Sequence, residues 1–121
     1  KPAKGGRESG PSQRQLRAGE LIRHALVEVL REEEIHDPAL EGVSVTVTEV
    51  RLSPDLKHAT CFVEPLGAGV TGQETAEIVK ALNKVAKYLR GRLSLPLSDR
   101  HPDHAALMTA NFIFGLGGNN E

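Results

Sequence analysis

VSVTVTEVRL at residues 43–52 and KHATCFVE at residues 57–64 alternate apolar with polar side chains. This period of two is typical of strands with one buried face, and Ser53-Pro54-Asp55 between the two segments is typical of a tight turn. After Glu49 the apolar positions of the first segment shift by one residue, which indicates a β-bulge. The two segments therefore predict a β-hairpin at the centre of the fold.

Amphipathic helices are expected on both sides of this hairpin. From Gln13 to about Glu34 the apolar residues recur every three or four positions, and Ser12 is a candidate N-cap. The same spacing returns from about residue 73 to Leu93, and LMTANFIF at residues 107–114 predicts a last strand. The order is α-β-β-α-α-β. It predicts an α+β protein with a three-stranded sheet and helices on one face of that sheet.

Length and composition limit the class of protein. The 121 residues fit one domain, and no apolar run approaches the roughly 18 residues that span a bilayer. The first residues lack the apolar segment of a secretory signal, so a cytoplasmic protein without membrane contact is expected. Residues 1–12, rich in Gly and Pro, predict a disordered tail, residues 13–114 the folded domain, and residues 115–121 a flexible end.

Charge is distributed unevenly along the chain. The formal net charge is -1, but residues 1–31 carry +4, residues 32–79 carry -8 and residues 80–121 carry +3. Electrostatic attraction acts over about one Debye length, ~8–10 Å at cellular salt, so local charge matters more than the total. A near-neutral total therefore does not exclude a polyanionic partner.

A run of bases without acids is the strongest functional signal. KALNKVAKYLRGR at residues 80–92 places Lys80, Lys84 and Lys87 at i, i+4 and i+7 on one side of a helix, and the predicted helix 13–34 carries further arginines. A solvated helix face is the alternative interpretation. With three Phe and one Tyr, backbone and shape contacts with folded RNA are favoured over base stacking. The candidate RNA-binding residues are Arg14, Arg17, Arg23, Lys80, Lys84, Lys87, Arg90 and Arg92.

Residues suited to catalysis or metal binding are few. Cys61 lies in the middle of a predicted strand, on its apolar side, and is expected to be a buried, inert thiol. His101 and His104, near Asp99 and Asp103, have a spacing that suits a divalent metal, but Pro102 favours a solvated loop there. The chain is therefore expected to be neither an enzyme nor a protein with a metal or cofactor.

Several short motifs together resemble the ribosome-binding factor A family of bacterial small-subunit maturation factors. They cover roughly residues 13–93 and read IHDPAL at 35–40, VTVTEV at 45–50, LSPDLKHA at 52–59, KALNK at 80–84 and YLR at 88–90. The resemblance implies a KH-like (type II) fold that lacks the usual GXXG clamp and joins two helices by an Ala-x-Gly kink. Val85-Ala86-Lys87 stands at that position without a glycine, so a shifted kink and a continuous helix both remain open. Residues 94–121 diverge from the family pattern.

The resemblance also implies a function. Family members are non-enzymatic and monomeric, bind the free 30S subunit or its 16S rRNA precursor, and assist rRNA processing alongside assembly GTPases. The alternative is a protein interaction module that binds a basic partner through the acidic residues 32–64. The sequence does not indicate which rRNA helix is contacted.

Overall fold

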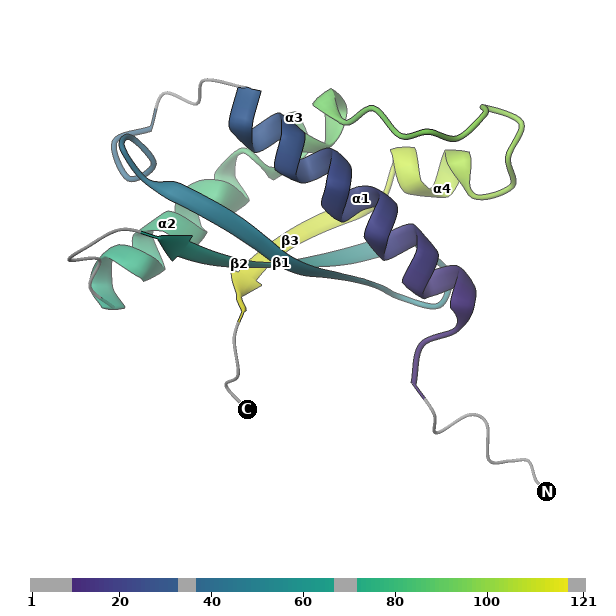
Figure 1. Cartoon of the computed structure of the whole chain (residues 1–121), viewed down its shortest axis with the longest axis horizontal. Helices are drawn as coiled ribbons and strands as arrows, with labels where there is room; N and C mark the ends of the chain where they lie inside the picture. Colours follow the sequence, from purple (N-terminus) through teal and green to yellow (C-terminus); the bar gives the residue numbers. More distant parts are fainter. Residues whose placement is uncertain (1–9, 33–36, 67–71, 118–121) are drawn as a thin grey trace.

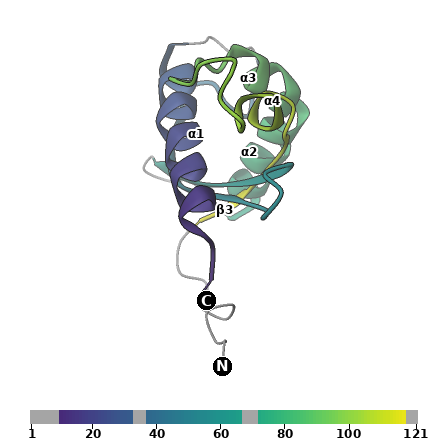
Figure 2. The ribbon, with the colours of Figure 1, turned by 90° about the vertical axis from the view of Figure 1, so that its right-hand side faces the viewer.

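The computed structural model describes residues 10–32, 37–66 and 72–117. Its elements are, in chain order, α1 (Gln13–Glu32), β1 (Ser44–Leu52), β2 (His58–Leu66), α2 (Gly72–Lys84), α3 (Ala86–Arg92), α4 (His104–Met108) and β3 (Asn111–Leu116). Figures 1 and 2 show α1 and the α2–α3 pair side by side on the same face of one sheet. The α+β architecture with helices on one face, predicted from the sequence, is confirmed.

The sheet has the order β1-β2-β3 and mixes two kinds of pairing. β1 and β2 are antiparallel, as expected for a hairpin, and β3 pairs with β2 in parallel. Val47 pairs with Val63 and Glu49 pairs with Phe62, so Thr48 is the extra residue of a β-bulge. This bulge explains the shift in apolar positions after Glu49, and the predicted irregularity is confirmed.

The turn between β1 and β2 satisfies its own backbone. The Leu56 N–H donates to the Ser53 carbonyl at 2.8 Å, and the Asp55 carboxylate accepts from the Lys57 N–H at 3.0 Å and from the Ser53 hydroxyl at 2.6 Å. Leu56 has a φ of 63°, rare for a residue with a side chain, and is fully buried. Burial of its side chain in the core offsets the backbone strain of this turn.

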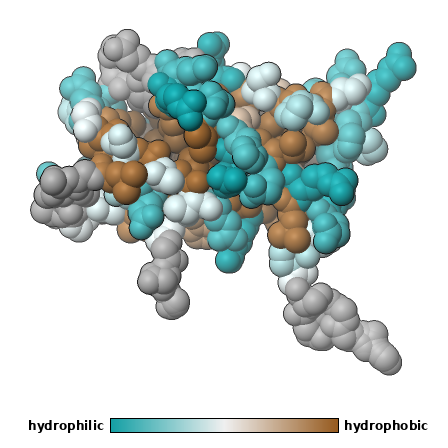
Figure 3. Space-filling view, in the orientation of Figure 1, coloured by the Kyte–Doolittle hydropathy of each residue, from teal (hydrophilic) through white to brown (hydrophobic). Residues whose placement is uncertain are grey.

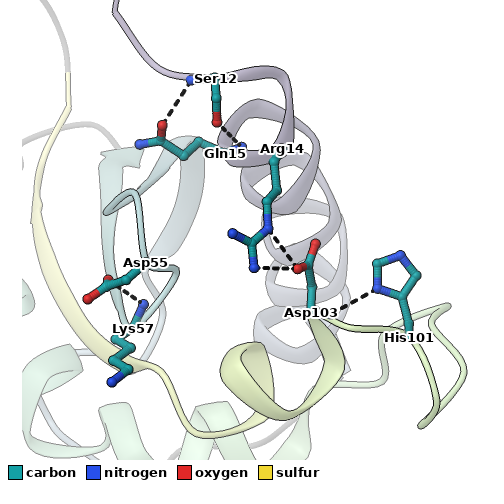
Figure 4. Close-up of polar contacts among 7 residues, drawn as sticks. All are labelled: Ser12, Arg14, Gln15, Asp55, Lys57, His101 and Asp103. Atoms are coloured by element: carbon teal, nitrogen blue, oxygen red, sulfur yellow. Dashed lines mark hydrogen bonds and ion pairs between the residues drawn. The ribbon is translucent and has the colours of Figure 1, made fainter.

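The start of α1 is fixed to the end of β1. The Ser12 hydroxyl accepts from the Gln15 N–H at 3.2 Å, and the Gln15 side chain accepts from the Ser12 N–H at 2.9 Å (Figure 4). This reciprocal pair is a capping box and confirms Ser12 as the N-cap. The Gln15 amide also donates to the Leu52 carbonyl at 2.8 Å, which ties the helix to the strand.

The core lies between the sheet and the helices. Its fully buried members come from all layers and include Ile22, Leu26, Cys61, Leu82 and Phe114, each at most 2% exposed. The opposite face of the sheet is uncovered by any described element. There the Arg51 guanidinium lies 5.4 Å from the centre of the Phe62 ring, and Ile113 is 50% exposed.

The helix pair is interrupted at Val85. This residue has φ -107° and ψ 14°, its N–H donates to the Leu82 carbonyl at 3.1 Å, and its carbonyl accepts from the Leu89 N–H at 2.9 Å. Since φ is negative, the conformation requires no glycine. The break therefore lies within the expected Val85-Ala86-Lys87 segment, and a continuous helix from residue 73 to Leu93 is wrong.

Other boundaries differ from the predictions. β2 continues through Pro65 and Leu66, beyond the predicted end at Glu64. The strand predicted at 107–114 is wrong in its first residues, because Leu107 and Met108 belong to α4, and the strand runs over Asn111–Leu116. A short apolar run does not distinguish a buried helical turn from a strand. Parts of three predicted segments lie outside the described residues. They are residues 1–9 of the tail, residues 33–34 at the end of the first helix, and residues 118–121 of the C-terminal segment.

Asn83 binds the outer edge of β3. Its amide group donates to the Phe114 carbonyl at 3.1 Å, and its amide oxygen accepts from the Phe114 N–H at 2.8 Å. The side chain thus forms the two hydrogen bonds that a neighbouring strand would form. α2 is held against β3 by this pair, and part of the exposed strand edge is satisfied.

Gly19 allows α1 to pack closely on β1, and its replacement is expected to destabilise the protein. A Cβ at this position would collide with the Val50 carbonyl oxygen, which belongs to the rigid sheet backbone. Gly19→Ala should therefore lower the free energy of unfolding by ~1–3 kcal/mol in urea denaturation. Gly91→Ala is the control, because a Cβ there meets nothing within 4 Å. It should stabilise α3 by ~0.5–1 kcal/mol; equal effects of the two variants would contradict the close-packing explanation.

Loss of the Asn83 amide is expected to loosen β3. Asn83→Ala leaves both Phe114 backbone groups without their side-chain partner, so stability should fall by about 1 kcal/mol. The Phe114 amide should also exchange with deuterated water faster, measured by NMR. Asn111→Ala removes an exposed amide whose side chain makes no hydrogen bond to the described residues, and it should leave Phe114 exchange unchanged. Unchanged Phe114 exchange in Asn83→Ala would refute the proposed anchoring.

Candidate nucleic-acid interface

Three lysines form a row on the solvent side of the helix pair. Lys80 and Lys84 lie on α2 and Lys87 on α3, all three are exposed, and the break at Val85 separates the last two. Lys84 Nζ is 4.0 Å from Asp37 Oδ2, at the limit of an ion pair. Lys80 and Lys87 make no hydrogen bond or ion pair with any described residue. The row therefore presents concentrated positive charge to solvent.

Arg90 has a structural partner. Its Nη1 donates to the Ala110 carbonyl at 3.0 Å, just before β3, and its Nε is buried without a hydrogen-bond partner within the described chain. The side chain is thus committed to holding the entry of β3 against α3. Arg92, at the end of α3, is exposed and takes part in an interaction of its own.

The arginines of α1 differ in their surroundings. Arg14 Nη2 lies 2.6 Å from the Asp103 carboxylate, and Arg23 Nη2 lies 2.9 Å from the Glu20 carboxylate. Arg17 is exposed and has no hydrogen bond or ion pair with any residue that the structure describes. With 3.6 residues per turn, Arg23 lies about 120° around the helix from Arg17. Arg14 and Arg17 thus share one flank of α1 and Arg23 lies apart from them.

The candidate residues form two groups instead of one surface. The N-terminal half of α1 and helix α2 lie toward opposite ends of the long axis of the molecule (Figure 1). Figure 3 shows hydrophilic residues along the outward side of α1, in the same orientation. Lys80 and Lys84 lie one turn apart on α2 and Lys87 follows in the first turn of α3, whereas Arg14 and Arg17 lie one turn apart on α1.

Ion pairing changes the pKa values of the arginine partners. The hydrogen bond from Arg14 lowers the pKa of Asp103, and the same bond raises the pKa of Arg14. Arg23 likewise lowers the pKa of Glu20 by a side-chain hydrogen bond. These carboxylates therefore remain ionised at neutral pH and compensate part of the arginine charge.

Cys61 and His101, considered for catalysis and metal binding, have structural surroundings. Cys61 is fully buried, and desolvation raises the pKa of its thiol to about 12, which confirms the predicted buried and unreactive cysteine. His101 Nδ1 accepts from the Asp103 N–H at 3.0 Å. Within residues 10–32, 37–66 and 72–117 no three His, Cys, Asp or Glu side chains are grouped to hold a metal ion. Within the same ranges, no helix has the length and apolarity needed to span a bilayer.

The pocket beside the arginines could not be identified from the sequence. Leu97, His101 and Leu107 line a pocket together with Arg14 and Arg17. Leu97 and His101 belong to the connection between α3 and α4, Leu107 belongs to α4, and only the fold brings these two segments beside α1. No local motif or spacing connects them.

The ion pair between α1 and the start of α4 is expected to stabilise the protein in a pH-dependent way. The pKa of Asp103 is lower in the folded than in the unfolded chain, so the pair contributes stability above the usual Asp pKa of about 3.8. This contribution is lost as the pH falls through the lowered folded-state pKa. Asp103→Asn should therefore be less stable than wild type in urea at about pH 7, with a smaller difference at about pH 2.5.

Asp99→Asn is the matched control for this pH dependence, because Asp99 is exposed and unpaired among the described residues. Its stability should follow that of the wild type at both pH values. An Asp103→Asn effect that is independent of pH would show that the ion pair is not its cause.

Comparisons with known proteins identify the family. The family model described as "Ribosome-binding factor A" matches residues 14–102. Ribosome-binding factor A of Caulobacter vibrioides (strain NA1000 / CB15N) is 74% identical over 90 residues, which cover 74% of this chain and 60% of that protein. The Phenylobacterium zucineum (strain HLK1) protein of the same name is 66% identical over 95 residues, which cover 77% of this chain and 63% of that protein. The chain thus spans less than two thirds of the length of these relatives.

The fold comparison agrees with the sequence comparison. The crystal structure of ribosome-binding factor A from Thermus thermophilus superposes with a TM-score of 0.58 at 20% identity, over 84% of this chain and 94% of that one. This similarity confirms the predicted KH-like α+β fold. With the family match to residues 14–102, the conclusion is that the chain belongs to the ribosome-binding factor A family.

Proposed function

We propose that this protein is a cytoplasmic binding factor that holds the free 30S ribosomal subunit, or its precursor, through phosphates of 16S rRNA and assists its maturation. Two observations support the proposal. The chain belongs to a family named for ribosome binding. Its helix pair also presents the lysine row Lys80, Lys84 and Lys87 to solvent, and this row is the observation on which the proposal chiefly rests.

The lysine row suits the RNA backbone. Each ammonium group that neutralises a phosphate releases a condensed counterion, so affinity depends on the number of contacts and on salt. Glu77 lies one turn before Lys80 on α2, but no ion pair between the two residues is formed. Of the three lysines in the row, only Lys84 has an ion-pair partner among the described residues. Its Nζ lies 4.0 Å from Asp37 Oδ2, which is long for an ion pair.

The place of the row in the fold also favours nucleic acid. KH domains clamp the nucleic-acid backbone at a GXXG loop between two helices. Here that junction is the single residue Val85, with Lys84 before it and Lys87 shortly after. The charge of two lysines replaces the close backbone approach that glycines would allow.

The remaining candidate bases contribute unequally to this proposal. Arg90 holds the Ala110 carbonyl and Arg23 is held by Glu20, so neither is well placed to donate to RNA without giving up a protein contact. Arg14 and Arg17 form a second contact group in the N-terminal half of α1, away from α2 (Figure 1). Arg92 stays in the proposed set because of its exposed position at the end of α3.

Removal of the lysine row is expected to weaken subunit binding and its salt dependence. Lys80→Ala/Lys84→Ala/Lys87→Ala should lower affinity for free 30S subunits at least about tenfold at ~0.1 M salt, measured by co-sedimentation. The slope of log affinity against log salt should decrease by about two, because each lost phosphate contact removes ~0.7–0.9. Arg90 is kept in this variant, since its replacement would disturb β3.

The matched control removes three exposed bases elsewhere, with the same change in net charge. Arg31→Ala/Lys57→Ala/Arg100→Ala should retain most of the affinity and the salt slope of the wild type. Equal loss in both triple variants would show that only net charge matters. Binding that survives nuclease treatment of the subunit would instead support the alternative, in which the acidic residues 32–64 bind a basic protein.

A further inference from the structure

A pocket lies between the first turns of α1, the connection that follows α3, and α4. Its apolar lining is contributed by Ala18 and Leu21 of α1, Leu97 of the connection and Leu107 of α4. Ala18 and Leu107 are buried, and Leu21 and Leu97 are half-buried. The pocket therefore has an apolar floor that is open to solvent on one side.

The wall of this pocket is held in place by the Arg14–Asp103 pair. Asp103 Oδ1 accepts from Arg14 Nε at 2.7 Å and lies 2.6 Å from Arg14 Nη2, so both contacts involve the same carboxylate oxygen (Figure 4). The carboxylate is only 14% exposed. Its charge is compensated by Arg14, so it does not oppose the entry of an anion. The pair also joins α1 to α4 and keeps the two sides of the pocket at a fixed separation.

Two further side chains present hydrogen-bond donors at the rim. Arg17 lines the pocket, is exposed, and makes no hydrogen bond or ion pair with the described chain. His101 Nδ1 accepts from the Asp103 N–H at 3.0 Å, so in the neutral ring the proton is assigned to Nε2. Figure 4 shows the imidazole of His101 bound through one nitrogen, with the opposite side of the ring turned away from Asp103. The guanidinium of Arg17 and the Nε2–H of His101 are thus both donors.

We propose that this pocket binds one unpaired nucleotide of RNA, with the base on the apolar floor and the phosphate at Arg17 and His101. The inference rests on the proposed function and adds to it a second, chemically distinct contact. The lysine row binds phosphates alone, whereas this pocket has a surface for a base beside donors for a phosphate.

The chemistry of the lining favours a nucleotide over other anions. Inorganic phosphate would use the donors of Arg17 and His101 but leave the leucine floor without a partner. An acidic protein side chain has a charge but no flat apolar group to cover Leu21 and Leu97. Single-stranded bases also stack on guanidinium planes, and Arg14, fixed by Asp103, offers such a plane without an aromatic residue.

Binding to the pocket can be measured by NMR titration of the full chain with a single-stranded RNA hexamer of mixed sequence. The expected result is a shift of the backbone amides of Ala18, Leu21, Leu97 and Leu107. Arg17→Ala should weaken hexamer binding at these amides roughly tenfold, since it removes charge-assisted hydrogen bonds to the phosphate. Arg31→Ala, which removes the same charge from the far end of α1, should leave hexamer binding at the pocket unchanged.

Three results would overturn the proposal. The first is that the hexamer shifts only backbone amides of α2 and α3. The second is that Arg17→Ala and Arg31→Ala weaken hexamer binding equally. The third is that inorganic phosphate binds the pocket as tightly as the hexamer does. The last result would show that the apolar floor does not recognise a base.

Co-sedimentation with 30S subunits separates this proposal from the proposed function. Wild-type co-sedimentation without any hexamer shift at the pocket overturns the pocket and supports subunit binding through the lysine row. Pocket shifts without wild-type co-sedimentation support the nucleotide site and overturn the proposed subunit function.

Discussion

The parallel pairing of β3 with β2 is the constraint on which the rest of the structure depends. Parallel neighbours cannot be joined by a tight turn, so the chain must cross from one end of the sheet to the other. Helices α2, α3 and α4 lie in that crossing, and α2 and α3 cover the part of the sheet that α1 leaves open. Asn83 and Arg90 donate to the backbone at and just before β3, while Phe112 and Phe114 enter the core from its inner side. The position of one short strand thus determines where the helices pack.

The same crossing determines which bases keep their charge without a partner among the described residues. Arg90 belongs to a segment with five bases and no acids, residues 80–92, yet its guanidinium donates to the Ala110 carbonyl. Arg14 is similar, because α4 places Asp103 beside it. Lys80, Lys87 and Arg17 keep their charges without a partner in the described chain. The sequence therefore contains more basic residues than the surface leaves without a protein partner. Hydrogen bonds between distant segments, such as those of Arg90 and Arg14, account for the difference.

Local features of the fold could be predicted from the sequence, and features that depend on distant segments could not. The hairpin, the bulge after Val47 and the cap at Ser12 follow from alternation and from side chains a few residues apart. Asn83 lies in a basic helical run, and its partner Phe114 is 31 residues away. Only the packed structure shows that Gly19 faces the Val50 carbonyl. Helical spacing predicts that Lys80 and Lys84 share a face, but not how Lys87 lies beyond the break at Val85. The pocket beside Arg17 needs three segments that no periodicity connects.

On the proposed function, two separate groups of cations give a selectivity for RNA that neither group gives alone. On this proposal, the formal net charge of -1 favours only weak non-specific attraction to RNA, and affinity comes from local contacts. On the proposed function, the lysine row and the Arg17 pocket lie toward opposite ends of a single packed domain, which fixes the distance between them. Two linked sites strengthen each other only when the partner can reach both at once. A flexible single strand loses conformational entropy when it is ordered to reach both sites. A folded RNA that already holds an unpaired nucleotide at the right distance from its backbone phosphates loses much less. A rigid spacing between two weak sites therefore favours one folded RNA over the many unfolded ones.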